Sequence, residues 1–325
     1  MASKKKASKG NGSKTAQPRK TAPKPKIHLP SFHYISNKKP MAPLPREFVL
    51  GIQELEDALG MRCLLFIQNG RHPDGRPVSI EHSCFRYFFD NRAEIVPDDK
   101  VAILIESGGG DPSCAYKLAL LLNKHCGGYT ALIPSYAKSA ATLLSLGSER
   151  IIMGKYAELG PLDMQIESNE EETRQSALNH VQALERLGAY SKQTLDEVMI
   201  MLLKRTGKKV SSIMPPAIDF TTELVSPMMK NIDVVRYTEM SRLLKVGEEY
   251  AERLLRPHYG KDSKVIAEIL VSKYPEHGFV IDYEEAGDIG LKVEVPDGKL
   301  ADAYTKILPY LDEFTAYGFV DEVSI

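Results

Sequence analysis

The chain has 325 residues, 43% of them hydrophobic, and a formal net charge of −1, so it is long enough to bury a sizeable core. Its four cysteines show no Cys-x-x-Cys spacing, which predicts reduced thiols rather than a zinc site or a disulfide framework. No apolar run reaches membrane-spanning length, and the first residues lack the apolar core of a secretory signal. We therefore expect a soluble cytoplasmic protein without a membrane span, and we find no motif for a metal or an organic cofactor.

Residues 1–26 differ in composition from the rest of the chain. They hold eight lysines and one arginine with no acidic residue, which leaves a net charge of −10 on residues 27–325. Such a segment cannot bury a core, so we expect a disordered tail. It can contact nucleic acid or an anionic surface. Because no aromatic residue interleaves its charges, a solubilising role or contact with acidic sister subunits is favoured.

The elements expected before residue 100 follow a Pro-rich entry that ends at Pro45. Apolar periodicity and turn residues predict, in order, a helix over Phe48–Leu59, a strand over Cys63–Ile67, a loop over Asn69–Pro77 and a helix over Ile80–Phe89.

A glycine turn follows the next strand. The continuous apolar run Val101–Ile105 predicts a strand buried on both faces. Gly108–Gly110 leaves backbone N–H groups uncovered by side chains. Asp111 then reads as an N-cap and Pro112 as the first residue of a helix. By itself this turn fits an ordinary α/β connection as well as an anion site, and it lacks the spacing of a nucleotide-binding loop.

Ser139 adds a possible nucleophile to the glycine turn. A strand over Tyr129–Ile133 precedes it, and Ser139–Gly147 reads as a short helix of small and apolar residues, with a further strand over Ile151–Met153. A serine at a helix N-terminus lies where amide dipoles favour negative charge. A lone serine of this kind is usually a packed residue or a cap. Together with the glycine turn, it suggests acyl-transfer chemistry from one hydroxyl and backbone amides.

The second half of the chain is mainly helical in pattern. Helices are expected over Thr173–Leu187, Ser191–Arg205, Glu239–Leu255 and Ser263–Ser272, with a break at Ile213–Pro216. After these come strands over Phe279–Ile281 and Leu291–Val293, a helix between them over Glu284–Ile289, and a last helix over Leu300–Tyr317.

The order of these motifs resembles the Clp protease proteolytic subunit and signal peptide peptidase A. The resemblance is strongest to the serine dehydrogenase proteinase branch of that superfamily. It is carried by Ser139-Ala140-Ala141-Thr142, by Leu159-Gly160-Pro161-Leu162-Asp163-Met164-Gln165, and by Tyr274-Pro275-Glu276-His277-Gly278 with the Glu285-Ala286 and Gly290-Leu291 that follow. It covers about residues 60–165 and 265–295 and implies an α/β fold, a ClpP/crotonase-like wound β-sheet with covering helices.

The resemblance implies roles for individual residues. Ser139 matches the nucleophile, and the amides of Gly109 and Ala140 match the oxyanion hole. The general base departs from the pattern, because no histidine stands at Pro161–Asp163, where the Clp-type subunit places one. Nor does a lysine lie between Lys155 and Lys192, where a Ser–Lys dyad would need one.

Four residues remain as candidates for the base. His277 is the first choice, oriented by Asp163, because a Ser–His pair needs a group that fixes the tautomer. His180 is the second choice, and Lys138 and Lys155 are weaker ones. His277 fits equally well as a turn histidine without a catalytic role.

These features predict a domain division and a function. The tail and Pro-rich entry occupy residues 1–45, a ClpP-like domain residues 46–299, and a C-terminal helix and tail residues 300–325. The expected function is that of a serine hydrolase, a peptidase acting on peptides or proteins. The alternatives are a non-catalytic assembly or binding module and, more weakly, crotonase-like acyl-CoA chemistry. The long mid-chain helices and the resemblance suggest a homo-oligomer.

Overall fold

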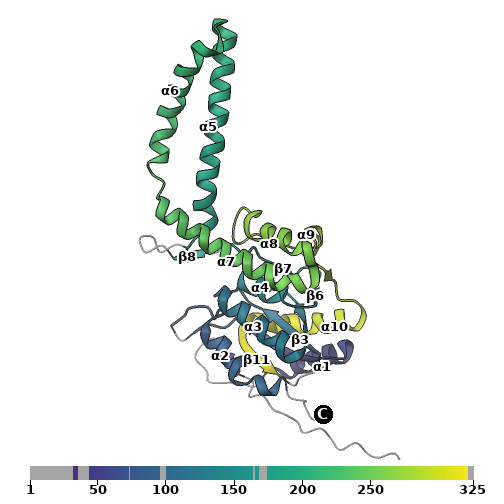
Figure 1. Ribbon diagram of the computed structural model, residues 1–325. Helices are drawn as coiled ribbons and strands as arrows, with labels where there is room; N and C mark the ends of the chain where they lie inside the picture. Colours follow the sequence, from purple (N-terminus) through teal and green to yellow (C-terminus); the bar gives the residue numbers. More distant parts are fainter. Residues whose placement is uncertain are drawn as a thin grey trace, which may run out of the picture.

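The computed structural model describes residues 32–35, 44–72, 74–95, 100–163, 165–167 and 174–320. The expected disordered tail over residues 1–26 lies outside these ranges. Within them, the centre of the molecule is a seven-stranded sheet in the order β1-β11-β2-β3-β4-β6-β10 (Figure 1). Its strands are β1 (Phe32–Ile35), β2 (Arg62–Gln68), β3 (Val101–Glu106), β4 (Tyr129–Ile133), β6 (Arg150–Met153), β10 (Val293–Glu294) and β11 (Phe314–Phe319).

Short strands and helices complete the fold. Two small sheets pair β5 (Tyr136–Ala137) with β7 (Glu158–Leu159), and β8 (Gln165–Glu167) with β9 (Arg174–Ser176). The α-helices are α1 (Arg46–Leu59), α2 (His82–Asp90), α3 (Pro112–Cys126), α4 (Ala140–Leu146), α5 (Ala177–Thr206), α6 (Val210–Met229), α7 (Val234–Tyr259), α8 (Ser263–Ser272), α9 (Tyr283–Asp288) and α10 (Gly298–Ile307). The 3-10 turns are η1 (Arg92–Glu94), η2 (Gly260–Asp262) and η3 (Leu308–Glu313).

Helices cover both faces of the sheet, which confirms the predicted α/β class. Alternate residues of β3 enter different cores: Ile103 and Ile105 pack with α2, α3, α4, α7 and α8, whereas Ala102 and Leu104 pack with α1 and α10. Every residue of β3 is buried, as expected for a strand covered on both sides.

The sheet brings the glycine turn and the serine helix to one edge. Strands β2, β3, β4, β6 and β10 pair in parallel, and β11 joins them antiparallel, between β1 and β2. The carboxyl ends of neighbouring parallel strands meet at the same edge, where wound α/β proteins place their sites. The connections after β3 and β4, which carry Gly108–Gly110 and Ser139, therefore lie side by side.

Most predicted elements are present, and two predictions before residue 230 are wrong. The two helices expected over 173–205 are one helix, α5, because Gly188 fits inside it without interruption. The break expected at Ile213–Pro216 lies within α6, whose prolines include Pro215 and Pro216. A proline's fixed φ suits a helix, and the packing of Ile213 and Ala217 in the helix interface offsets the lost hydrogen bonds.

Two further predictions are wrong near the C-terminus. The helix expected over Leu300–Tyr317 ends at Ile307 and continues as the 3-10 turn η3, because Pro309 has no N–H for an α-helical hydrogen bond. Residues Phe314–Phe319 form β11 instead, in a segment rich in aromatic and β-branched residues. Phe279–Ile281 is not a strand, and only an isolated bridge joins Ile281 to Leu159.

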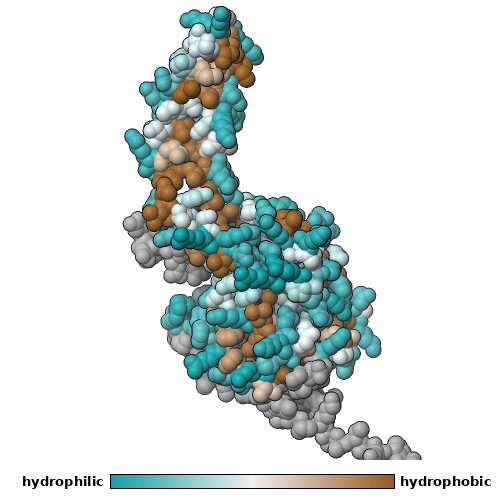
Figure 2. Space-filling view, in the orientation of Figure 1, coloured by the Kyte–Doolittle hydropathy of each residue, from teal (hydrophilic) through white to brown (hydrophobic). Residues whose placement is uncertain are grey.

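Helices α5 and α6 form a hairpin, here called the arm, that projects away from the sheet (Figure 1). No helix among the described residues is both long and apolar enough to cross a membrane. The arm nevertheless exposes large apolar side chains along its length (Figure 2). They include Ile200, Met201, Val210, Met214, Ile218, Phe220, Met228 and Met229, each at least 40% exposed.

We predict that Gly51→Ala destabilises the protein. A Cβ at Gly51 in α1 would lie 2.7 Å from Cγ2 of Ile307, which is fully buried in α10. Overpacking of this kind typically costs about 1–3 kcal/mol, which exceeds the gain of up to about 1 kcal/mol in helix propensity. Urea denaturation followed by circular dichroism gives the free energy of unfolding.

The matched control is Gly188→Ala in α5, where a Cβ would meet open space. We expect this variant to be unchanged or slightly stabilised. Equal effects at the two glycines would contradict the close packing of α1 on α10.

Candidate active site

Ser139 has an unusual backbone conformation. Its φ of 51° and ψ of −117° make it the one non-glycine residue with positive φ in the described part of the chain. A non-glycine residue in such a region carries strain of about 1–3 kcal/mol, and strain of this kind collects at functional sites. Ser139 is also the N-cap of α4, so the first amides of that helix lie next to its side chain.

Hydrogen bonds on both sides hold the strained residue. Before it, Lys138 N–H donates to the Ser107 carbonyl at 2.9 Å. After it, the Thr142 hydroxyl oxygen lies 2.7 Å from the Ala137 carbonyl oxygen and 2.9 Å from that of Gly160, and it can donate its proton to either one. The same hydroxyl accepts from Gly160 N–H at 3.0 Å. Thr142 is fully buried, so these bonds are made away from water.

Two glycines permit the close approach of other segments to Ser139. A Cβ at Gly109, whose φ is +99°, would lie 2.6 Å from the Lys138 carbonyl oxygen and 2.9 Å from Ser139 Cβ. A Cβ at Gly160 would lie 2.7 Å from Lys138 Cδ and 3.2 Å from Ser139 N. Both positions thus require glycine, and both bring backbone against the serine.

The amides predicted for the oxyanion hole differ in their present partners. Ala140 N–H opens α4, a position that has no acceptor within its own helix. Gly109 N–H donates to Ser107 Oγ at 3.0 Å. The N–H of Gly110 takes no part in the bridge to Ile80 and has no hydrogen-bond partner among the described residues. In this conformation, the amides of Gly108 and Gly110 have no hydrogen-bond partner among the described residues, whereas that of Gly109 is engaged.

The structure places His277 against Asp163. His277 Nδ1 lies 2.7 Å from Asp163 Oδ1, and the Ser176 hydroxyl donates to Asp163 Oδ2 at 2.6 Å. Asp163 is 2% exposed, whereas the His277 side chain is 21% exposed. A carboxylate at Nδ1 fixes the tautomer that leaves Nε2 for proton transfer.

Lys138 joins the serine segment to the histidine segment. Its Nζ forms an ion pair with Glu158 at 3.0 Å and donates to the carbonyls of Leu159 and Phe279 at 3.3 and 3.4 Å. Phe279 is two residues from His277, and Leu159 and Ile281 exchange backbone hydrogen bonds. Ser139 and the His277–Asp163 pair therefore belong to segments that contact one another.

The other candidate bases have weaker positions. Lys155 is exposed and lies beside the Tyr156 ring, with its Nζ 5.7 Å from the ring centre. His180 is on α5, but its side chain is outside the described part of the chain. Lys138 is engaged as just described, by one carboxylate and two carbonyls.

Glu106 is a buried acid directly before the glycine turn. It is the last residue of β3 and is fully buried, and its Oε2 accepts from the N–H groups of Ser135 and Tyr136 at 3.2 and 3.4 Å. Its Oε1 is buried without a hydrogen-bond partner among the described residues. Burial raises the pKa of Glu106 to about 8, against the lowering effect of the bonds from Ser135 and Tyr136.

Sequence reasoning assigned no role to four residues of this region: Glu106, Ser107, Thr142 and Gly160. Three of them left a readable signal, because Glu106 ends an otherwise apolar strand and Thr142 and Gly160 lie in the motifs that carry the resemblance. The partners of Ser107 and Thr142 lie up to 39 residues away in sequence, and no pattern in the chain indicates them.

The fold is a wound α/β fold, with helices on both faces of a mainly parallel sheet. Residues 91–214, which include the glycine turn, Ser139 and Asp163, match the family model described as ClpP-like SDH-type serine proteinase. The resemblance to the serine dehydrogenase proteinase branch is thereby confirmed for this central segment. His277 lies outside the matched residues.

Two proteins of Methanocaldococcus jannaschii are similar to the chain. MJ1495 is 28% identical over 201 residues, and MJ0137 is 27% identical over 200 residues. Each match covers 61% of this chain, and it covers 54% and 55% of the two relatives, so the chain spans about half of their length. Among solved structures, a mutant of the 1510-N membrane-bound stomatin-specific protease matches with 12% identity and a TM-score of 0.39, over 67% of this chain and 75% of that one. A likeness this remote has no bearing on function.

We predict that Glu106→Gln changes the pH dependence of stability. In the folded protein, Glu106 keeps its proton up to a pH of about 8, whereas the unfolded chain releases it near the ordinary value of 4.5. The wild type therefore loses stability as the pH rises from about 4.5 to 8, by about 3–5 kcal/mol for a shift of this size. The neutral amide has no proton to lose, so the difference in unfolding free energy between variant and wild type should rise with pH across this window.

Denaturant unfolding curves recorded at pH 4.5, 6, 7 and 8.5 measure this difference in unfolding free energy. Glu239→Gln, at an exposed position on α7, is the matched control and should show a constant difference. A constant difference for Glu106→Gln would mean that Glu106 is ionised in the folded protein.

Proposed function

We propose that the protein is a serine peptidase that cleaves peptide bonds through an acyl-enzyme on Ser139. The observation that carries the proposal is the strained Ser139 at the start of α4, pressed against the glycine turn. A strained serine whose side chain is next to free backbone amides is suited to nucleophilic attack and costly to keep for packing alone. The family match of residues 91–214 supports the same class of reaction.

Each residue has a defined role in the proposed mechanism. Ser139 Oγ attacks the scissile carbonyl carbon, and His277 Nε2 takes the hydroxyl proton. Asp163 holds the imidazole through Nδ1 and stabilises the imidazolium. The carbonyl oxygen, now negative, is stabilised by Ala140 N–H and by an amide of the glycine turn. His277 then protonates the leaving amine, and water hydrolyses the ester on Ser139.

Two of the amides of the glycine turn, those of Gly109 and Gly110, are candidates for the second oxyanion bond. Gly109 is the donor implied by the resemblance, but its N–H must first leave Ser107 Oγ. Gly110 requires no such release, because its amide has no partner among the described residues. We therefore propose that Gly110 shares or takes the role first assigned to Gly109.

We predict that Ser139→Ala abolishes covalent labelling by a fluorophosphonate probe and any peptide turnover, without loss of folding. His277→Ala should reduce the labelling rate by about 10²–10⁴-fold, the contribution typical of a general base. Asp163→Asn should also slow labelling, because an amide does not hold the same tautomer. Gel fluorescence of labelled protein over time gives the rates.

Ser191→Ala on α5 and His258→Ala on α7 serve as controls and should label like the wild type. Undiminished labelling of Ser139→Ala would refute the nucleophile. Unchanged labelling of His277→Ala, with Ser139 still required, would refute only the base and pass that role to His180 or a lysine. No labelling of folded wild-type protein would favour the non-catalytic alternative.

We also propose that the arm mediates assembly of a homo-oligomer. Exposed apolar residues line both of its helices, from Ile200 on α5 to Met229 on α6. A surface of this kind on a projecting hairpin is unfavourable in water unless another surface covers it. Because the same arm is present on each copy, a second copy supplies a matching surface. The basic tail lies outside the described residues, and no observation supports contact with nucleic acid.

We predict that the double variant Ile218→Glu, Phe220→Glu lowers the oligomeric state. These side chains are 45% and 52% exposed on α6, so charge there should break an apolar interface and leave the fold of the body intact. Light scattering coupled to size-exclusion chromatography measures the mass. Val265→Glu, on α8 and 58% exposed, is the control outside the arm. A monomeric wild type at micromolar concentration would rule out arm-mediated assembly.

A further inference from the structure

We propose that a cavity between α2, the segment before it and β11 binds a small uncharged aromatic molecule, and that this site is connected to Gly109 by a chain of buried hydrogen bonds. The cavity has a volume of about 470 Å³, which is within the range of small-molecule sites. None of the described residues that line it belongs to the predicted catalytic set.

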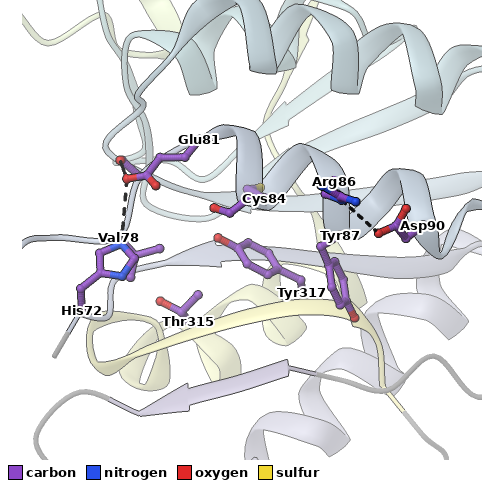
Figure 3. A pocket seen from close by; sticks show the side chains of 11 residues that line it. His72, Val78, Glu81, Cys84, Arg86, Tyr87, Asp90, Thr315 and Tyr317 are labelled. Carbon is purple, nitrogen blue, oxygen red and sulfur yellow. Dashed lines mark hydrogen bonds and ion pairs between the residues drawn. The ribbon is translucent and has the colours of Figure 1, made fainter.

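The walls of the cavity select the class of ligand. The rings of Tyr87 and Tyr317 lie beside each other in its wall, with centres 5.8 Å apart, and Val78 and Cys84 add apolar surface (Figure 3). Aromatic walls of this kind favour a flat apolar body that can stack or pack edge-on. A volume of this size accepts a one-ring or two-ring molecule and is too small for a folded peptide.

A polar pair at one end points to a single hydrogen-bonding group on the ligand. His72 Nε2 is buried and has no hydrogen-bond partner among the described residues, and Glu81 Oε1 lies 4.0 Å from it (Figure 3). That distance is too long for a direct hydrogen bond. A ligand N–H or O–H placed between these atoms would satisfy the buried nitrogen, whereas Glu81 Oε1 already accepts from the Ser79 hydroxyl at 3.2 Å. By contrast, Arg86 and Asp90 at the other end already form an ion pair at 3.6 Å.

A relay of hydrogen bonds runs from the cavity wall to the glycine turn. Gly109 N–H donates to Ser107 Oγ at 3.0 Å, and Ser107 Oγ donates to Gln68 Oε1 at 2.6 Å. Gln68 Nε2 then donates to the hydroxyl of Tyr317 at 2.7 Å, and Tyr317 lines the cavity. All three donors point in one direction, so each bond polarises the next.

The relay is buried, so a change at its Tyr317 end affects the other hydrogen bonds of the relay. Ser107 is fully buried and Gln68 is 3% exposed, so a broken bond in the chain is not replaced by bulk water. Tyr317 lines the cavity, so a ligand there touches the last member of the relay directly. A shift of the Tyr317 hydroxyl changes the bond that Gln68 Nε2 donates to it. The bonds that Gln68 Oε1 and Ser107 Oγ accept then change as well. The position of the Gly109 amide then depends on whether the cavity is filled.

The cavity wall also connects to the turn through the main chain. Val78, Ser79 and Glu81 line the cavity, and Ile80 between them bonds the turn, with Ile80 N–H donating to the Gly109 carbonyl at 2.8 Å. Asp111 N–H donates to the Ile80 carbonyl at 2.7 Å. This ladder and the relay give two connections from one cavity to one residue, Gly109. The consequence for catalysis rests on the proposed function, whereas binding and the response of Gly109 do not.

Indole is a suitable probe of the site. It has a flat apolar body and one N–H donor, and the chain contains no tryptophan, so indole can be excited at wavelengths that its 15 tyrosines do not absorb. For a ligand of this size we expect a Kd of about 0.1–1 mM. Val78→Phe should fill the cavity and weaken binding by about tenfold or more. His72→Ala, at a half-exposed loop position, should weaken it by several fold without affecting folding.

Val246→Phe on α7, a valine 41% exposed and outside the cavity, is the matched control and should bind indole like the wild type. Absence of saturable binding to the folded wild type would overturn the site. Equal affinity of wild type, Val78→Phe and His72→Ala would also overturn it, because indole would then bind elsewhere.

Selective isotope labelling tests the relay without reference to activity. Glycine labelled with ¹³C at the carbonyl and ¹⁵N at the amide gives amide–carbonyl correlation peaks only for Gly–Gly bonds, which in this chain report Gly109, Gly110 and Gly128. Indole should move the Gly109 peak of the wild type and leave the Gly128 peak in place. Ser107→Ala and Tyr317→Phe each break the relay, so both should abolish the shift while Tyr317→Phe still binds indole.

An unmoved Gly109 peak at saturating indole would overturn the connection. So would an undiminished shift in both Ser107→Ala and Tyr317→Phe. These results are independent of fluorophosphonate labelling, so a failure of the proposed function and a failure of this inference are distinguishable.

Discussion

The contact between the glycine turn and the chain before Ser139 is the constraint on which the site depends. Ser107 accepts from Lys138 N–H and donates its own N–H to the Tyr136 carbonyl, at 2.9 and 3.3 Å. These bonds make an isolated parallel bridge between Ser107, directly after β3, and Ala137, the last residue of β5. The chain must then turn into α4 within two residues, and Ser139 absorbs the change of direction with a positive φ. The strain at Ser139 thus follows from the short segment between this bridge and α4.

The same edge concentrates buried polar groups. Gln68, Glu106, Ser107 and Asp163 are each no more than 3% exposed, although polar residues are rarely buried to this extent. Most of their polar atoms are paired, as burial requires. Glu106 Oε1 is an exception and lies directly before the turn. A protein core built only for stability would place apolar side chains at these positions, so the polar groups indicate that this edge is specialised.

The sequence predicts the elements of this edge well and their conformation poorly. Val101–Ile105, Asp111 with Pro112, and Tyr129–Ile133 follow local rules of periodicity and capping, and the structure contains each element as expected. The positive φ of Ser139 is imposed by contacts with Gly109 and Gly160, so no local pattern indicates it. The contact of His277 with Asp163 spans 114 residues and is suggested by a family resemblance, not by spacing. The sequence does not predict β11, because the helical pattern that precedes it extends through Tyr317. The pairing of β11 with β2, a contact between distant segments, outweighs that local pattern.

The arm and the His277–Asp163 pair are physically joined by one hydroxyl. Ser176 Oγ accepts from Leu178 N–H at 3.1 Å and so caps the first turn of α5, while its proton is donated to Asp163 Oδ2. Asp163 has its other oxygen on His277 Nδ1. A movement of the first turn of α5 therefore changes a hydrogen bond to the carboxylate that orients the imidazole. The long helix whose far half exposes apolar residues begins at the group that positions the proposed base, so the surface proposed for assembly and the proposed catalytic pair share a structural origin.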